Sequence, residues 1–185
     1  MKSGVKRKKR TVEYEKRKVL KTFISTVLIL AFLFFCSLSI SVYVFPLARV
    51  YDDSMTPDLK KNTIVLINKS CRIGRGDLVA FSVSDKLLVK RCIAVSGDVV
   101  DIDSDGSIYL NGILLDEKYV SNKQYGTVST DFPCTVPDGC IFVLSDNREN
   151  YSDSRNKLIG SVCEDEILGK VVFKLFPFNE TSIVK

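Results

Sequence analysis

The chain contains no histidine among its 185 residues. A Ser-His-Asp triad is therefore impossible, and so is a zinc site built on imidazole ligands. Any acid–base chemistry near neutral pH must use Lys, Asp, Glu, Tyr or Cys. No two cysteines have the Cys-x-x-Cys spacing that is typical of a metal site. We therefore expect neither a metal nor a cofactor.

The cysteines do not form an even set for disulfide bonding. Of the six, Cys36 lies in a long apolar run and five follow it, so a complete disulfide framework would leave one thiol over. Cys134 and Cys140 flank a Pro-Asp-Gly turn, and one interpretation is a disulfide across that turn. The alternative is that both are small buried side chains.

Positive charge is concentrated at the start of the chain. Residues 1–21 hold ten Lys or Arg and two Glu, a local charge of +8, whereas residues 22–185 carry −3. A nucleic-acid-binding domain would carry its basic patch on the folded surface, so this distribution argues against nucleic acid as a partner. Residues 1–21 are predicted to be a disordered, solvated tail. Positive residues beside a membrane span remain on the cytoplasmic side.

Residues 22–47 contain no charged residue. As a helix they would extend about 39 Å, which is enough to cross a hydrocarbon core of about 30 Å. The apolar core of a cleavable signal peptide is shorter, and a buried helix of a soluble protein is the remaining alternative. We predict one transmembrane helix over 22–47, a cytoplasmic N-terminus, and an extracytoplasmic domain over 48–185, in a cell membrane.

The rest of the chain has the pattern of a mainly β protein. Short segments rich in β-branched and aromatic residues alternate with Gly, Pro, Asn and Asp turns, and Asn111-Gly112 is a strong hairpin signal. The only helical turns expected after the span are at 161–167. We predict an antiparallel coiled sheet or partial barrel. Its strands are predicted at residues 63–67, 77–83, 87–95, 107–115, 140–144 and 170–176.

Ser54 is the candidate nucleophile. A lone serine is usually structural, but this one lies in a tight segment that ends at Pro57, about seven residues beyond the apolar run. A possible base, Lys90, follows on a predicted strand. Strand alternation places Lys90 among apolar residues on both faces, where loss of hydration disfavours the ammonium form. The alternative is a lysine whose amine reaches water. Arg91 cannot be the base because its guanidinium stays protonated.

A third polar cluster spans residues 145–155 and follows an apolar run. An ordinary loop is the default interpretation. However, Asp153 and Arg155 could form a charge-assisted pair, and Ser152 or Ser154 could orient the lysine amine. A buried neutral lysine requires such supporting groups.

Together these stretches resemble the type I signal peptidases, the membrane-bound Ser-Lys proteases. Residues 54–57 (Ser-Met-Thr-Pro) are similar to the family's nucleophile motif, and 75–81 (Arg-Gly-Asp-Leu-Val-Ala-Phe) to its Gly-Asp-hydrophobic strand. Lys90-Arg91 with Gly97-Asp98 resembles the general-base motif. Residues 146–155, with Asp146, Asn147 and Asp-Ser-Arg at 153–155, resemble the Gly-Asp-Asn…Asp-Ser-Arg motif. The likeness covers about residues 22–178 and resembles the compact Gram-positive-type members.

The resemblance implies a serine endopeptidase that needs no cofactor. Ser54 would attack the peptide carbonyl, Lys90 would be the general base, Asp153 and Arg155 would form a supporting salt bridge, and Ser154 would lie near the lysine. Asp146 and Asn147 would complete the supporting motif. The substrates would be secretory preproteins, cut after small-x-small sequences at the membrane surface.

The sequence departs from the family pattern near the predicted site. Asp52 stands where the family usually has Ser or Gly, and an ionised Asp cannot donate a hydrogen bond, so the oxyanion hole would depend on the Ser54 N–H. Tyr151 stands where a serine near the lysine is typical, so its hydroxyl or Ser152 would have to substitute. Ser145 replaces a glycine. Two alternatives follow: a non-catalytic or specialised relative for assembling surface structures such as pili, and a LexA-like self-cleaving protein.

Overall fold

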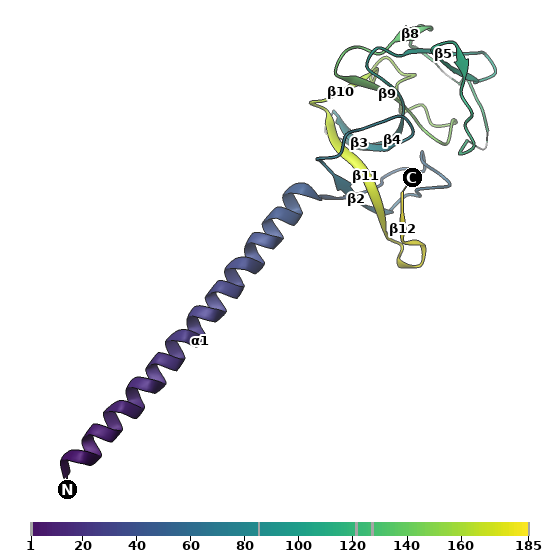
Figure 1. The fold of residues 1–185 in the computed structure, drawn as a ribbon. Helices are drawn as coiled ribbons and strands as arrows, with labels where there is room; N and C mark the ends of the chain where they lie inside the picture. The colour runs from purple at the N-terminus through teal and green to yellow at the C-terminus, as the bar shows by residue number, and fades with distance from the viewer. Residues whose placement is uncertain (1, 85, 121, 127, 185) are drawn as a thin grey trace. The chain divides into compact units, whose positions relative to one another are not determined.

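The computed structural model describes residues 2–84, 86–120, 122–126 and 128–184 of the chain (Figure 1). The chain divides into two units, residues 1–43 and 44–185. The helix α1 (Lys2–Val44) forms the first unit and ends at the first residue of the second. In the described part of the second, the regular elements are antiparallel strands and one short 3-10 helix, η1 (Phe178–Glu180). The predicted fold class, a mainly β domain after an apolar helix, is confirmed.

Helix α1 differs from the sequence prediction at both ends. It begins at Lys2, so the prediction of a disordered tail is wrong; Lys, Arg and Glu are good helix formers, and the tail continues the apolar helix. It ends at Val44 because Phe45 precedes Pro46, and the proline ring disfavours a helical conformation in the residue before it. The span predicted to reach residue 47 is therefore too long, and Leu47 instead begins a strand.

The apolar part of α1 fits a membrane anchor. One stretch, Glu15–Ser39, is 25 residues long and contains an 18-residue segment with a mean hydropathy of 2.3, so it is long and apolar enough to cross a membrane. Its large apolar side chains are not covered by protein, as expected for a helix that faces lipid.

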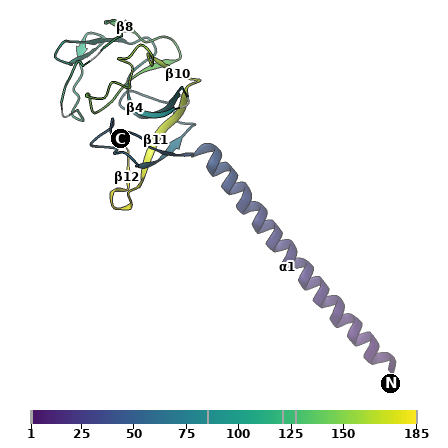
Figure 2. The same cartoon turned by 180° about the vertical axis from the view of Figure 1, so that it is seen from behind.

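Within the described residues, eight strands form the larger sheet, in the order β1-β2-β11-β3-β4-β9-β10, with β12 paired to β11. Figure 2 shows β12 beside β11 from behind. All strand pairs of this larger sheet are antiparallel, and β3 and β4 lie at its centre. The bounds of these strands are β1 (Leu47–Arg49), β2 (Ile64–Asn68), β3 (Leu78–Val83), β4 (Lys86–Val95), β9 (Cys140–Leu144), β10 (Val162–Cys163), β11 (Ile167–Phe176) and β12 (Ser182–Ile183).

A second, smaller sheet has the order β7-β6-β5-β8. Figure 1 shows β5 and β8 at one end of the β unit, and β2, β11 and β12 at the other. The predicted hairpin at Asn111-Gly112 is confirmed, since both residues have positive φ angles and join β6 to β7. One strand over 107–115 was therefore the wrong prediction. The bounds are β5 (Val99–Ile102), β6 (Ile108–Leu110), β7 (Ile113–Leu114) and β8 (Cys134–Thr135).

Strand β4 is covered on both faces, as predicted from its apolar alternation. Its residues from Val89 to Ala94 are all buried. The alternation itself breaks down at an irregularity in the β4–β9 pairing between Cys92 and Ala94. As a result, Ile93 and Ala94 both join the core shared with the smaller sheet, and Cys92 joins a separate cluster on the larger sheet.

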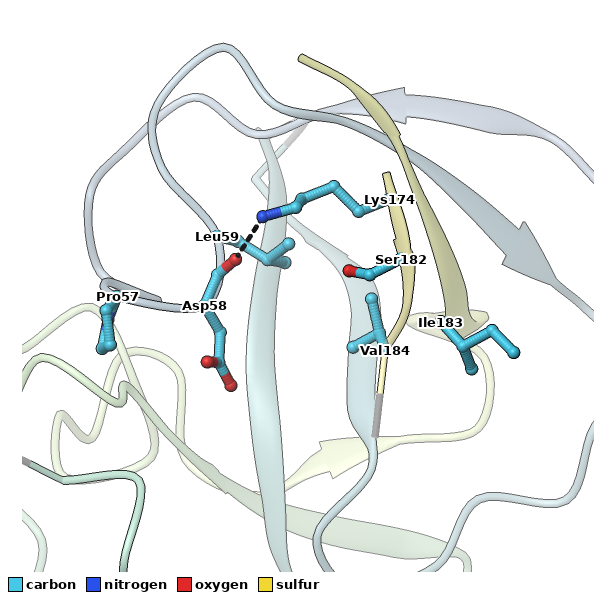
Figure 3. Close-up of a pocket in the computed structure, with 7 residues that line it drawn as sticks. All are labelled: Pro57, Asp58, Leu59, Lys174, Ser182, Ile183 and Val184. Carbon is cyan, nitrogen blue, oxygen red and sulfur yellow. Dashed lines mark hydrogen bonds between the residues drawn. The ribbon is translucent and has the colours of Figure 1, made fainter. Parts of the chain in front are cut away.

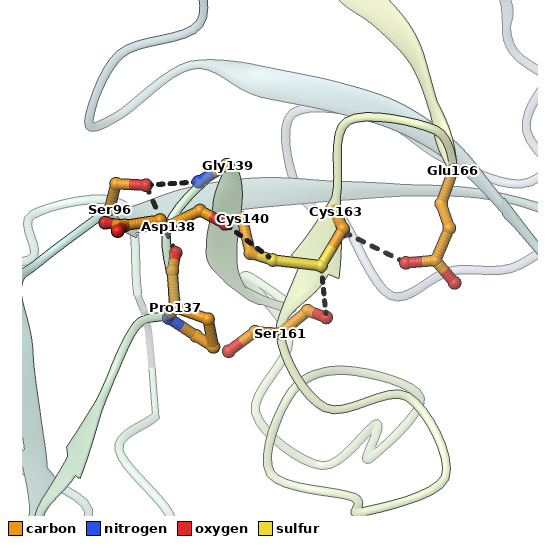
Figure 4. The surroundings of a disulfide bond; sticks show 8 residues. All are labelled: Ser96, Pro137, Asp138, Gly139, Cys140, Ser161, Cys163 and Glu166. Carbon is orange, nitrogen blue, oxygen red and sulfur yellow. Dashed lines mark hydrogen bonds between the residues drawn. A yellow bond between two sulfur atoms is a disulfide. The ribbon is translucent and has the colours of Figure 1, made fainter.

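The disulfide links Cys140 to Cys163 (Figure 4). The interpretation of a disulfide between Cys134 and Cys140 is therefore wrong, and Cys134 is a free cysteine. Cys134 lies in β8 of the smaller sheet, opposite Val100, whereas Cys140 opens β9 and lies directly opposite Cys163 in β10. The predicted helical turns at 161–167 are also absent, because β10 and the start of β11 occupy that stretch.

Loss of this disulfide is expected to destabilise the β unit. It closes a loop with a sequence separation of 23, and restricting the unfolded chain over such a loop contributes about 3 kcal/mol. The double variant Cys140→Ala/Cys163→Ala should therefore unfold at lower denaturant concentration than the oxidised wild type. Cys71→Ala, at a free cysteine, is the control and should not change the midpoint. Equal unfolding midpoints for wild type and double variant would contradict the assignment.

Candidate active site

Ser54 lies in a turn between β1 and β2 that is anchored to the core. Met55 and Leu59 are fully buried against the larger sheet, and the N–H of Leu59 donates to the Met55 carbonyl at 2.7 Å. The Thr56 N–H and hydroxyl both donate to the Asp53 carbonyl. Apolar anchoring on one side and short-range hydrogen bonds on the other therefore fix the position of Ser54, which is itself fully buried.

Lys90 projects from the middle of β4, where it pairs with Val79 of β3. Its side chain has no exposed surface. Its amine is in hydrogen-bond contact with the Ser54 hydroxyl oxygen. The sheet therefore brings together two fully buried side chains that are 36 residues apart in the sequence.

Burial dominates the electrostatics of Lys90. Desolvation lowers the pKa of its amine below the ordinary lysine value, and the carboxylates of Asp52, Asp153 and Asp146 oppose this shift without reversing it. The neutral amine is therefore populated at a lower pH than in an exposed lysine. Only that form can accept the proton of a hydroxyl group.

Asp52 contacts both of these side chains. Its Oδ1 accepts a hydrogen bond from the Ser54 hydroxyl at 2.6 Å and a longer one from the Ser54 N–H at 3.3 Å. Its Oδ2 lies 3.4 Å from the Lys90 amine. Sequence reasoning considered Asp52 only as a missing oxyanion donor and did not anticipate these contacts.

Asp146 and Asn147 support the site from the end of β9. Asp146 is buried and binds the Arg91 guanidinium through both oxygens, at 2.8 and 2.6 Å. The Asn147 N–H donates to the Ser54 carbonyl at 2.9 Å and so fixes the backbone of the serine turn. Arg91 and Lys90 are adjacent on β4 and point to opposite faces, which explains why one pairs with Asp146 and the other meets Ser54.

Asp153 and Arg155 form a second buried ion pair. The Arg155 guanidinium donates to both Asp153 oxygens at 3.0 and 2.8 Å, and also to backbone carbonyls that include that of Asn150 at 2.8 Å. Asp153 additionally accepts the Ser145 N–H at 3.0 Å. The hydrogen bonds of this pair therefore stabilise the conformation of the loop formed by residues 145–155.

Comparison with known proteins identifies the fold family. The family described as signal peptidase, peptidase S26, matches residues 19–176. The chain is 38% identical over 156 residues to signal peptidase I S of Bacillus subtilis (strain 168), over 78% of this chain and 84% of that protein. The chain belongs to the signal peptidase family. It is also 32% identical over 190 residues to signal peptidase I U of the same organism, over 95% of this chain and 98% of that protein.

A crystal structure of a signal peptidase I from Enterococcus faecalis V583 is also similar, with a TM-score of 0.47 and 29% identity over 55% of this chain and 98% of that chain. Membership of the signal peptidase family makes this chain a peptidase, that is, a hydrolase of peptide bonds. Its apolar N-terminal helix agrees with the membrane anchor expected of such an enzyme.

The described contacts of the two serines and the tyrosine that were considered as lysine partners are with other groups than the Lys90 amine. Ser154 is buried, and its hydroxyl oxygen accepts the Val143 N–H at 2.9 Å. Ser152 is exposed. The ring of Tyr151 lies under the Arg155 guanidinium, 5.0 Å from its centroid to Cζ. In the described part of the chain, the polar partners of the Lys90 amine are Ser54 and Asp52.

Ser145 is the one buried side chain without a hydrogen-bond partner for its hydroxyl among the described residues. Ser145 stands in place of the family's glycine. It directly follows Leu144, the last residue of β9, which pairs with Arg91 of β4.

A further buried pair was missed by the sequence reasoning. Arg148 binds Glu117, and both side chains are almost completely buried. Tyr119 donates to Glu117 at 3.1 Å and stacks under Arg91, 4.2 Å from its ring centroid to Cζ. No periodic signal marks this segment, although two acidic residues beside a tyrosine could have suggested a partner for an arginine.

Two pockets flank the turn that carries Ser54. One, of about 350 Å³, is lined by residues 57–59 together with Lys174 and residues 182–184, and Lys174 spans it to donate to the Asp58 carbonyl at 3.3 Å (Figure 3). The other, of about 310 Å³, lies between residues 56–57 and residues 146–149, and Asn122 also lines it. Open space is thus available on both sides of the serine turn.

Breaking the buried Asp153–Arg155 pair should destabilise the domain strongly. Arg155→Ala leaves the Asp153 carboxylate buried without its cation, which costs about 3–5 kcal/mol. Lys157→Ala removes an exposed partner of Asp131 and is the control, with an expected cost below about 1 kcal/mol. Denaturant unfolding monitored by circular dichroism measures both effects. Equal losses for the two variants would contradict the argument.

Proposed function

We propose that this chain is a signal peptidase I, a serine endopeptidase in which Ser54 is the nucleophile and Lys90 the general base. The observation that carries the proposal is the hydrogen-bond contact between the Ser54 hydroxyl and a lysine amine that is fully buried. Burying a lysine amine is unfavourable for the stability of the fold, but a buried amine with a lowered pKa is what a general base near neutral pH requires.

In the proposed reaction, the neutral Lys90 amine accepts the Ser54 hydroxyl proton as Oγ attacks the peptide carbonyl carbon. The Ser54 N–H donates to the carbonyl oxygen, which becomes negatively charged. The resulting ammonium group then gives its proton to the leaving amine, and the peptide bond breaks to leave an ester on Ser54. Water, deprotonated by the same amine, hydrolyses the ester and restores the site.

The surrounding ion pairs support this role by holding the site in place. Arg91 neutralises the charge of Asp146, and Arg155 that of Asp153. These two carboxylates therefore stabilise the ammonium form of Lys90 less than unpaired carboxylates would. The Asn147 N–H on the Ser54 carbonyl fixes the backbone that presents the hydroxyl. A site that retains its geometry without substrate has little reorganisation to perform during the reaction.

The proposed substrates are secretory preproteins, cleaved after small-x-small sequences at the membrane surface. The basic residues before the apolar span favour an N-terminus on the cytoplasmic side, which would place residues 48–185 on the opposite side. Exposed edges of the antiparallel sheet offer an extended substrate a strand to pair with. In this arrangement the basic N-terminal part of α1 is cytoplasmic and its apolar part is the membrane anchor.

Removing either member of the pair should abolish cleavage without unfolding the protein. Ser54→Ala deletes the attacking oxygen, and Lys90→Met replaces the amine with an apolar group of similar length, so each should lower kcat/KM by at least about a thousandfold. The assay is cleavage of a preprotein by the full chain in detergent, followed by gel electrophoresis.

The controls are Ser70→Ala and Lys86→Met, at an exposed serine and at an exposed lysine of β4. Both should cleave at the wild-type rate. If Ser54→Ala or Lys90→Met kept normal cleavage, the pair would not be catalytic. If the wild type itself cleaved no preprotein, the non-catalytic relative for assembling surface structures would gain support.

Activity should rise with pH. Because only the neutral amine is active and burial lowers the pKa of Lys90, kcat/KM should increase as the pH passes through that lowered value and should level off below the pKa of an exposed lysine. A pH–rate profile from pH 5 to 10 tests this expectation. A profile without a rising limb would contradict a lysine base.

A further inference from the structure

The position of Asp52 distinguishes this site from a simple Ser-Lys pair. One carboxylate bridges the two proposed reacting groups, with Oδ1 accepting the Ser54 hydroxyl at 2.6 Å and Oδ2 lying 3.4 Å from the Lys90 amine. Asp52 is about one-third exposed, whereas Ser54 and Lys90 are fully buried. The carboxylate therefore connects the buried pair to solvent.

Other charges near Lys90 are already balanced. Asp146, which follows β9, binds Arg91, and Asp153, in the same polar loop, binds Arg155. Among the described residues, the Lys90 amine is the one cationic group that pairs with Asp52. Its negative charge consequently acts on the lysine without an arginine to offset it.

From these contacts we propose that Asp52 is a third member of the reacting site. Its carboxylate orients the Ser54 hydroxyl and holds a proton on the Lys90 amine, and it thereby sets the pH above which the pair becomes active. The proposal rests on the proposed roles of Ser54 and Lys90. It assigns to Asp52 a function in the resting site that a neutral side chain could not perform.

The charge of Asp52 has two consequences, and both restrain the site. A carboxylate close to the amine stabilises the ammonium form, which cannot accept the Ser54 proton. The same carboxylate accepts the Ser54 N–H at 3.3 Å, the group that would otherwise bind the developing oxyanion. Its own pKa is shifted by two competing influences: burial raises it, but Lys90 and the hydrogen bonds from Ser54 lower it below the ordinary value. Asp52 is thus negatively charged at neutral pH and restrains the site.

The decisive variant is Asp52→Asn. Asparagine keeps an oxygen that can accept the Ser54 hydroxyl, but it carries no charge. An opposite charge at this distance shifts a pKa by roughly one to three units, so the rising limb of kcat/KM against pH should move to lower pH by at least about one unit. At a pH on the lower part of the wild-type limb, cleavage should be about tenfold faster. Asp52→Ala, which also removes the acceptor, should show the same shift with a lower kcat on the plateau.

Asp53→Asn is the matched control. Asp53 is exposed, lies one residue further along and accepts the Lys61 N–H at 2.8 Å, a bond that asparagine can keep. The variant makes the same change in net charge on the same turn, and its rising limb should coincide with that of the wild type. If Asp52→Asn does not fold, Asp52→Ser is the substitute, because it also removes the charge and retains a polar group.

A second measurement is independent of catalysis. The full chain is labelled with carbon-13 at the lysine Cε atoms, the Lys90 signal is assigned by its loss in Lys90→Met, and its titration is followed by NMR. The pKa of Lys90 should be lower in Asp52→Asn than in the wild type. An active wild type with an unmoved pH limb and an unmoved Lys90 titration in Asp52→Asn would overturn the role of Asp52 alone. An inactive wild type would overturn the proposed function, and the titration would still decide whether Asp52 controls the lysine.

Discussion

The burial of one lysine amine against one serine hydroxyl is the constraint on which the rest of the domain depends. An ammonium group taken out of water costs several kcal/mol, even after the protein relaxes around it. Lys90 therefore needs surroundings that stabilise the neutral form or supply compensating contacts. Strand β4 meets this need by lying at the centre of the larger sheet with both faces covered. The serine turn then closes the remaining side, held there by Met55 and Leu59 in the core.

Two arginines pair with the acidic residues that would otherwise stabilise the charged form of Lys90. Asp146 and Asp153 order the polar loop through hydrogen bonds with guanidinium groups and, for Asp153, with a backbone N–H group. Each also carries a negative charge that would favour the ammonium form of Lys90. Pairing each carboxylate with Arg91 or Arg155 retains its hydrogen bonds and reduces its field at the amine. Asp52 lacks that compensation, and so the balance of protonation in the site depends on it.

The sequence allowed prediction of the elements whose signals are local. Both faces of β4 are apolar, so its burial followed from alternation, and Asn111-Gly112 was recognisable as a hairpin because both turn positions need a positive φ. The proximity of Ser54 and Lys90 came from motif spacing and not from periodicity. By contrast, the pairing of Cys140 with Cys163 depends on which strands become neighbours, β9 and β10, and no local pattern encodes that. The same holds for the second sheet.

The link between α1 and Ser54, the proposed nucleophile, would suit a substrate that is held in the same membrane. Ser54 lies ten positions beyond the end of α1 at Val44, and ten residues of extended chain span at most about 33–36 Å. However the two units are oriented, the serine cannot move farther than this from the end of the helix. The short connecting segment limits the distance of Ser54 from the end of α1. The packing of the serine turn against the larger sheet fixes its conformation. A substrate held in the same membrane would therefore meet the serine at a high effective concentration, even if its affinity for the site is modest.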